Sequence, residues 1–351
     1  MLYNEGFLIP KSLGGMANAL LPILITECKN TDGLITVYGL RNPAKRRRIL
    51  RKALARFADE LKKTKCHTVI ISSEHLSSRL TSNSDVQRLR EILDTRTSDQ
   101  HIVIYLREPL EAAISCWSTW IRNGHSSNSL PSPGHPELQQ LCNHQLLLQR
   151  WSKDYGNKVI PRLFSKQELV NADVVSDFCS AVGIELTDNY QMPTRCNEKL
   201  SRPCQEILLR LNKEHSWLKD GRVNSTREIL LEKLAKHYAN LPPFTPSPRE
   251  IADYRNYYKE SDEWVRHNYF PHKSTLFAES TYEEVTYCNY REAIYDSTAS
   301  LIKDMWFEQD TIANKARRNH LLGLIRASCR ALKGKSLSMF SYVANTLTFK
   351  S

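Results

Sequence analysis

The chain has 351 residues, of which 41% are hydrophobic, and a formal net charge of +11 at pH 7. This composition argues against disorder and provides enough apolar side chains for a sizeable globular core. The positive charge favours an anionic partner: a nucleotide, an acidic glycan, nucleic acid or a negatively charged membrane surface. Charge alone does not choose among these classes.

Nine cysteines are spread along the chain. They lack the CxxC or Cys/His spacing of a metal site, and their odd number argues against a disulfide framework. The sequence also lacks a signal-peptide pattern and a long apolar run, so we expect neither a cleaved leader nor a transmembrane span. We therefore expect a cytoplasmic protein that uses no metal.

Residues 41–65 predict a basic amphipathic helix. Apolar side chains such as Ile49, Ala53 and Phe57 recur at three- and four-residue intervals, while arginines and lysines fill the other face. This face suggests binding to nucleic acid or a membrane, or simply a solvated surface. We favour the solvated surface, because no aromatic residues interleave with the charges as a stacking surface needs.

The next predicted element is a strand at residues 67–73, whose apolar run is Val69, Ile70 and Ile71. Glu74 follows directly. A carboxylate just past the carboxyl end of a parallel strand lies where open α/β sheets bind ligands. Glu74 is therefore a candidate site residue; the alternative is that it caps the following segment or forms a salt bridge with it.

The fold is expected to be organised around residues 101–124. An apolar run predicts a short strand buried on both faces, and Pro109 then begins a helix. Arg107 lies at the carboxyl end of the strand, and Ser115 follows about two helical turns further on. An arginine fork and a hydroxyl at such a junction suit a phosphate group. Alternatively, Arg107 pairs with a carboxylate and Ser115 has no special role.

Strands and helices continue to alternate beyond this helix. Residues 124–136 predict a surface loop, followed by a helix at 138–155, a strand at 158–164 and a helix at 166–182. Pro161 inside the strand argues for an edge position or a bulge. The alternation indicates a parallel sheet covered on both faces.

From about residue 200 the pattern is helical, with helices predicted at 203–212, 226–240 and 249–269. Aromatic residues between Tyr254 and Phe270 suit sugar stacking or packing, and packing is commoner at helical spacing. Residues 312–333 predict a basic amphipathic helix. It would lie on an anionic membrane, dock on a partner or dock on the protein's own core, and we slightly favour its own core.

One segment resembles a known family. Leu106-Arg107-Glu108-Pro109 followed by Ser115 resembles the 3′-phosphate-binding segment of sulfotransferases that use 3′-phosphoadenosine 5′-phosphosulfate (PAPS). Weaker similarity to a bacterial branch of that superfamily extends over residues 71–74, 197–201 and 258–277, so that the resemblance spans roughly residues 5–278.

The resemblance implies an α/β fold with a three-layer parallel sheet of the P-loop type. We expect this domain at residues 1–278 and a helical, basic C-terminal extension at residues 279–351. The implied function is transfer of a sulfuryl group from PAPS, as co-substrate, to a hydroxyl of a carbohydrate or related acceptor. Positioning and cationic side chains can support such chemistry without a metal.

The resemblance also assigns roles to individual residues. Arg107 and Ser115 would bind the 3′-phosphate of the nucleotide. The base that takes the acceptor's proton comes from the region after residue 71 in this superfamily, which makes Glu74 the candidate catalytic base. His75, directly beside it, is the rival base.

The sequence departs from the family at its beginning. Family members start with a strand, a phosphate-cradling loop containing Lys, Gly and Ser or Thr, and a helix that precedes a segment like residues 6–10. Residues 11–15 have suitable residue types in a different order. Two alternatives therefore stay open: an inactive or truncated relative that binds nucleotide or glycan, and a nucleic-acid-binding protein, which only the net charge favours.

Overall fold

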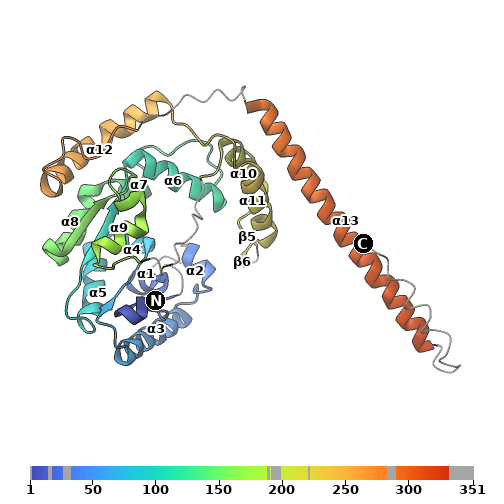
Figure 1. Cartoon of the computed structure of the whole chain (residues 1–351), viewed down its shortest axis with the longest axis horizontal. Coiled ribbons are helices and arrows are strands. Elements are labelled where there is room, and N and C mark those ends of the chain that lie inside the picture. Colours follow the sequence, from blue (N-terminus) through green and yellow to red (C-terminus); the bar gives the residue numbers. More distant parts are fainter. Residues whose placement is uncertain are drawn as a thin grey trace. The chain divides into compact units, whose positions relative to one another are not determined.

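The structure is a computed structural model that describes residues 2–14, 18–26, 33–187, 190, 199–219, 222–280, 282 and 290–331. The chain divides into two compact units, Met1–Thr286 and Tyr287–Ser351. The first unit is mixed α/β, mostly helical with short parallel strand pairs (Figure 1). This architecture confirms the expected α/β class.

The amino-terminal part of the first unit contains one parallel pair, β1 (Phe7–Leu8) and β2 (Thr68–Val69). The elements around it are η1 (Leu2–Glu5), α1 (Leu20–Ile25), α2 (Gly33–Val37) and α3 (Pro43–Lys63). The predicted basic helix is α3. It begins where the side chain of Asn42 accepts a hydrogen bond from the backbone N–H of Lys45, and it buries Ala53 and Phe57.

The second parallel pair is β3 (Ile102–Leu106) with β4 (Val159–Leu163). Pro161 of β4 lies opposite Ile104, and β4 pairs with no other strand in the described part of the chain. The edge position predicted from Pro161 is therefore confirmed. The predicted strand at 67–73 is shortened to the two residues of β2, and the described strands do not join into one continuous sheet.

Helix α6 (Pro109–Arg122) follows β3 and begins at the predicted proline. The predicted helix at 138–155 is instead two helices, α7 (Pro136–Cys142) and α8 (His144–Tyr155). The break occurs because the side chain of Asn143 accepts a hydrogen bond from the backbone N–H of Leu146 and so caps α8.

The helix predicted at 166–182 is helical only in its second half. There α9 (Val174–Ala181) begins after Asp173, whose side chain accepts hydrogen bonds from the backbone N–H groups of Val175 and Ser176. The cap therefore sets the start of the helix. The remaining elements of the first unit are α4 (Glu74–Arg79), α5 (Asn83–Asp94), η3 (Gly156–Lys158), η4 (Val170–Ala172), α10 (Arg202–Glu214), β5 (Leu218–Lys219), β6 (Arg222–Val223), α11 (Ser225–His237) and α12 (Pro248–Tyr269).

Tyrosines of α12 belong to the packing of this unit. Tyr254 and Tyr258 are each 1% exposed. Their hydroxyls donate hydrogen bonds of 2.6 Å to the carbonyls of Pro131 and Pro133, in the loop between α6 and α7. These two side chains are therefore packing residues, as helical spacing suggested, rather than a sugar-stacking surface.

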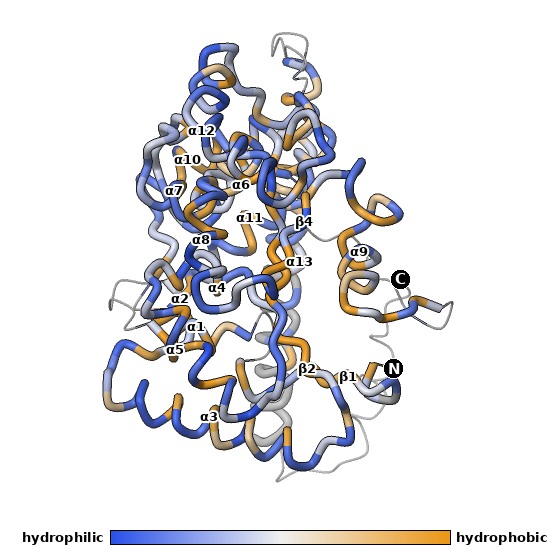
Figure 2. The backbone as a smooth tube through the Cα atoms, turned by 90° about the vertical axis from the view of Figure 1, so that its left-hand side faces the viewer, coloured by the Kyte–Doolittle hydropathy of each residue, from blue (hydrophilic) through white to orange (hydrophobic). Residues whose placement is uncertain are grey.

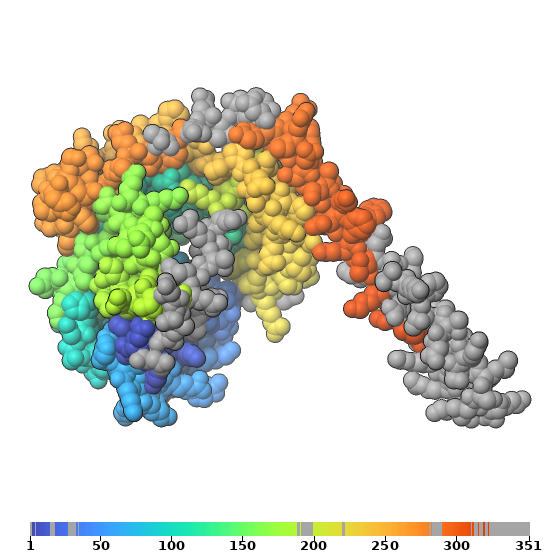
Figure 3. Space-filling model, in the orientation of Figure 1, coloured from blue at the N-terminus to red at the C-terminus, as the bar shows by residue number. Residues whose placement is uncertain are grey.

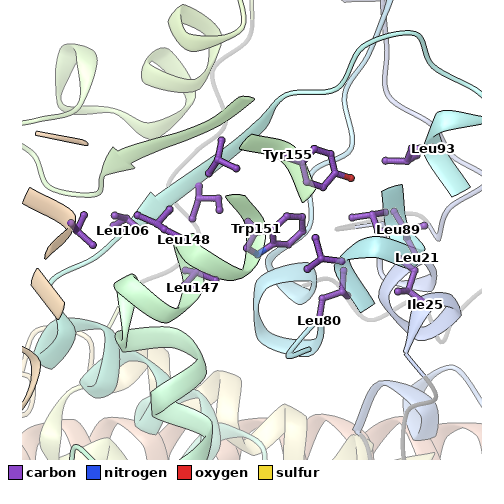
Figure 4. Close-up of a cluster of buried hydrophobic side chains, with 14 of the residues drawn as sticks. Leu21, Ile25, Leu80, Leu89, Leu93, Leu106, Leu147, Leu148, Trp151 and Tyr155 are labelled. Carbon is purple, nitrogen blue, oxygen red and sulfur yellow. The ribbon is translucent and has the colours of Figure 1, made fainter. Parts of the chain in front are cut away.

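The two parallel pairs share helices on both faces. On one face Cys179 of α9 forms a buried cluster with Phe7 and Ile70, and α9 lies beside the amino-terminal residues in Figure 3. The other face contributes to one larger core with residues from α5 and α8 (Figure 4). The apolar runs that form these clusters appear orange in Figure 2.

A buried carboxylate connects α9 to the second strand pair. Asp177 is 1% exposed. It accepts hydrogen bonds from the hydroxyl of Tyr105 at 2.7 Å, from the guanidinium of Arg162 at 2.6 Å and from the backbone N–H of Val170 at 3.1 Å. The hydrogen bonds from Arg162 are the main reason why the pKa of Asp177 is lowered to about 2.

The second unit contains α13 (Arg291–Ala331), a helix of 41 residues. The predicted basic helix at 312–333 falls within α13 up to Ala331, and its last two residues lie outside the described residues. Asn197 and Glu198 of the segment 197–201 also lie outside them. Among the described helices, none is long and apolar enough to cross a membrane.

We predict that Asp177→Asn lowers the free energy of unfolding at pH 7 by about 1.5–3 kcal/mol, the usual range for hydrogen bonds to a charged group. Because the folded pKa lies below the ordinary value of 3.8, the carboxylate stabilises the fold above about pH 4, and this contribution is lost as the pH falls towards 2. Urea denaturation at pH 7 and in acid measures both effects.

The exposed Asp59→Asn on α3 is the matched control, and its unfolding free energy should stay within about 0.5 kcal/mol of the parent chain. A difference between the parent chain and Asp177→Asn that is the same at pH 7 and pH 2.5 would contradict this account of Asp177.

Candidate functional site

A cavity of about 2350 Å³ lies at the β2–α4 and β3–α6 segments. Its lining includes Glu74, His75, Arg107 and Ser115. These are the site residues expected from the sequence together with the rival base, and they follow two different strands. The structure therefore brings all four to one cavity.

Arg107 is held by a carboxylate at this cavity. Its Nη2 lies 2.9 Å from Oε2 of Glu111, one turn into α6, and its guanidinium carbon lies 5.8 Å from the ring centre of Phe164. The ion pair expected under the alternative interpretation is thus present. It does not preclude phosphate binding, because a guanidinium has five N–H donors.

The carboxylate of Glu111 binds two further groups. Nζ of Lys199 lies 3.2 Å from it, and the hydroxyl of Tyr282 donates a hydrogen bond of 3.0 Å. Burial alone would raise the pKa of Glu111, but the charges of Lys199 and Arg107, together with the hydrogen bonds, lower it. Two cations therefore share one carboxylate, which leaves the group with a net positive charge.

The amino terminus of α6 is occupied by the protein itself. The side chain of Glu108 accepts a hydrogen bond of 2.8 Å from the backbone N–H of Glu111. Burial raises the pKa of Glu108. An anion that approached this helix terminus would compete with that carboxylate, so the guanidinium of Arg107 is the stronger candidate for holding a phosphate.

Ser115 lies on the exposed side of α6, with Thr119 one turn further on, and both residues line the cavity. The hydroxyl of Thr119 donates to the carbonyl of Ser115 at 3.0 Å. Among the described residues, none forms a hydrogen bond with the hydroxyl of Ser115, which leaves it able to bind a ligand in the cavity.

Glu74 is the first residue of α4, and its side chain is 81% exposed. Oε1 of Glu74 lies 3.8 Å from Nε2 of His75, whose side chain is 20% exposed. Nδ1 of that imidazole lies 3.1 Å from Nη1 of Arg79. A carboxylate and an imidazole side by side at a cavity can each accept a proton from a bound hydroxyl group.

In the segment 11–15, of which residues 11–14 are described, Lys11 and Ser12 bind an anion, but that anion is a side chain of the protein. The backbone N–H groups of Lys11 and Ser12 each donate to the carboxylate of Glu60 on α3 at 3.3 Å. The hydroxyl of Ser12 donates to it as well. Lys11 and Ser12 do not belong to the described cavity lining. The arginines of that lining are Arg79, Arg96 and Arg107, and the described lining contains no lysine.

The sequence did not reveal the partners of Arg107 in full. Lys199 lies in the segment 197–201 that carries part of the resemblance, which was the available signal, whereas Tyr282 had none. Within the described ranges, no group of three or more His, Cys, Asp and Glu side chains is arranged to hold a metal ion.

Comparisons of the chain with models of protein families, with curated proteins and with solved structures gave no match.

Proposed function

We propose that this protein transfers a sulfuryl group from PAPS to a hydroxyl of a carbohydrate or related acceptor. The proposal depends on one observation, that Arg107, Ser115 and Glu74 line the same cavity. Under this proposal Arg107 and Ser115 bind the 3′-phosphate, and Glu74 takes the proton of the acceptor hydroxyl. The oxygen of the acceptor forms the new bond to sulfur as the bond between sulfur and the 5′-phosphate oxygen breaks.

The proposed fold is a three-layer arrangement of the P-loop type. Its support is that α9 packs on β1–β2 through Cys179 and binds β3–β4 through Asp177, while α5 and α8 share one core with residues of both pairs. Two strand pairs that lie between the same two layers of helices occupy one common middle layer, as the strands of a single sheet do. Ligands of such folds bind outside the carboxyl ends of the strands, where Glu74 and Arg107 are found.

A second candidate function is binding of the nucleotide without transfer. The described cavity lining contains no lysine, and the backbone donors of Lys11 and Ser12 already bind Glu60. Sulfuryl transfer needs preorganised donors around the transferred group and the leaving phosphate. Without such donors the chain would bind adenosine 3′,5′-bisphosphate through Arg107 and remain inactive.

We predict that Arg107→Ala weakens binding of adenosine 3′,5′-bisphosphate by about 1.5–3 kcal/mol, the usual contribution of a hydrogen bond to a charged group. Isothermal titration calorimetry of both chains measures the loss. Arg47→Ala on the exposed face of α3 removes the same charge outside the cavity and should leave the affinity unchanged. Equal affinity of the parent chain for 5′-AMP and the bisphosphate would remove the basis for the assignment.

Glu74→Gln should keep bisphosphate binding and lower turnover by about 10²–10⁴-fold, because general base catalysis typically contributes that much. Transfer of labelled sulfate from PAPS to a panel of carbohydrate acceptors measures turnover. If transfer is unchanged in Glu74→Gln and lost in His75→Gln, His75 is the base. Bisphosphate binding without any transfer by the parent chain would favour the second candidate function.

The nucleic-acid alternative makes a different prediction about salt. A protein that neutralises many phosphates loses affinity steeply as salt rises, whereas a pocket for one nucleotide depends on salt weakly. We expect the affinity for the bisphosphate to change little between about 50 and 200 mM salt, a range over which binding to a duplex weakens steeply. Tight duplex binding combined with no bisphosphate binding would reject the sulfotransferase proposal.

A further inference from the structure

In the described part of the chain β2 pairs only with β1, so its other edge has no partner strand there, and residues of β2 line the cavity. The backbone N–H of Thr68 donates to the carbonyl of Gly6 at 3.1 Å, and that of Ile70 donates to Leu8 at 2.8 Å. Backbone groups of successive strand residues point to opposite sides of the strand. Val69 therefore directs its N–H and C=O away from β1, and Ile71 continues the same alternation.

Within the described ranges β3 pairs only with β4, so it too has an edge without a partner strand, and its residues line the same cavity. The backbone N–H of Phe164 donates to the carbonyl of Leu106 at 2.7 Å, so Leu106 and Ile104 direct their backbone groups towards β4. By the same alternation, Val103 and Tyr105 direct theirs to the other side. These four outward-directed residues line the cavity, and so do neighbours on the same strands such as Ile70 and Ile104.

Helices cover the remaining two sides. Phe178 and Ala181 of α9 line the cavity from the face on which Cys179 packs. Leu89 of α5 and Trp151 of α8 line it from the opposite face, where Figure 4 shows both side chains in the core. A central strand of a covered sheet has the same surroundings, namely two neighbouring strand edges and two layers of helices.

Two strand residues at the cavity are less buried than their composition predicts. Val103 and Tyr105 are half-buried, although a strand of this composition is expected to be buried on both faces. An occupant with apolar side chains would complete the burial of these two residues.

The size of the cavity suits such an occupant. Strands lie ~4.8 Å apart within a sheet, layers pack ~10 Å apart and each residue adds ~3.3 Å, so a five-residue strand occupies roughly 800 Å³. The cavity of about 2350 Å³ would then keep roughly 1500 Å³ free. That remainder exceeds the 300–1000 Å³ or so of a typical small-molecule site, so a strand and a nucleotide are compatible.

We infer that the cavity between β2 and β3 binds an extended strand of about five residues, supplied by a partner polypeptide and rich in β-branched apolar side chains. The strand pairs through its backbone with Val69 and Ile71 on one edge and with Val103 and Tyr105 on the other. This inference concerns strand pairing and does not depend on sulfuryl transfer.

Hydrogen exchange of single amides tests the inference. The probe is a ten-residue peptide with the central sequence Val-Ile-Val-Ile-Thr and flanking lysines, added in trans or joined to Met1 by a 20-residue Gly/Ser linker. Such a linker spans ~25 Å and gives an effective concentration near the millimolar range. We expect exchange at Val69, Val103 and Tyr105 to slow by at least about tenfold, with Thr68 and Ile104 unchanged.

Two controls separate strand pairing from unspecific contact. The same peptide with N-methylated backbone nitrogens cannot donate hydrogen bonds and should give no protection. In the protein, Val103→Pro removes an N–H that faces the cavity and leaves the bonds to β4 intact, so the fold should persist while protection by the peptide is lost. Circular dichroism of Val103→Pro checks the fold; if this variant unfolds, the N-methylated peptide alone decides.

Three results would overturn the inference. The first is that, in the chain alone, the amides of Val69, Val103 and Tyr105 already exchange as slowly as the amide of Ile104. This result would show that the chain fills the cavity itself. If removal of residues 334–351 then abolished the protection, the chain's own C-terminal segment would be the occupant. No protection by either form of the peptide would exclude a strand site. Protection by adenosine bisphosphate but not by the peptide would show that the occupant is a nucleotide, an outcome that leaves the proposed function standing.

Discussion

The buried carboxylate of Asp177 is the contact on which the arrangement of this unit depends. Helix α9 has only eight residues, and so short a helix is marginal in water without tertiary contacts. Asp177 fixes it to Tyr105 of β3 and Arg162 of β4, while Cys179, half a turn further, packs on β1 and the residue after β2. One short helix thereby positions both strand pairs, and with them the cavity between their edges.

The elements that sequence predicts well are those whose signals are local. The strand before Arg107 and the helix after it are marked by a β-branched run and by Pro109, within a few residues of each boundary. The predicted helices at 138–155 and 166–182 have wrong bounds. In both, the helical spacing of apolar residues continues past the residue that caps the observed helix. Asn143 and Asp173 offer the backbone a side-chain acceptor in place of a helical carbonyl, and such competition does not change the apolar pattern.

The candidate site likewise has one part that the sequence predicts and another part that it does not. Arg107, Ser115 and Glu74 could be placed together because strand ends in an α/β unit meet at one edge. Their neighbours could not. The carboxylate that holds Arg107 is also bound by Lys199, 88 residues further along the chain, and by Tyr282, 171 residues further. Contacts of that range depend on how loops return to the sheet, which one sequence does not specify, and they set the charge that an incoming phosphate would meet.

The edges of the strands differ in a way that bears on what the cavity accepts. Phe164 directs its N–H towards β3, so Pro161 directs its nitrogen to the outer side of β4, where the missing N–H blocks pairing. At the edges of β2 and β3 that point away from β1 and β4, the described residues include no proline: Val69, Ile71 and Val103 are β-branched, and all three line the cavity. Proline therefore lies at the outer edge of β4, whereas residues suited to strand pairing lie at the free edges of β2 and β3. That asymmetry is expected where an outer edge must stay unpaired and an inner gap receives a strand.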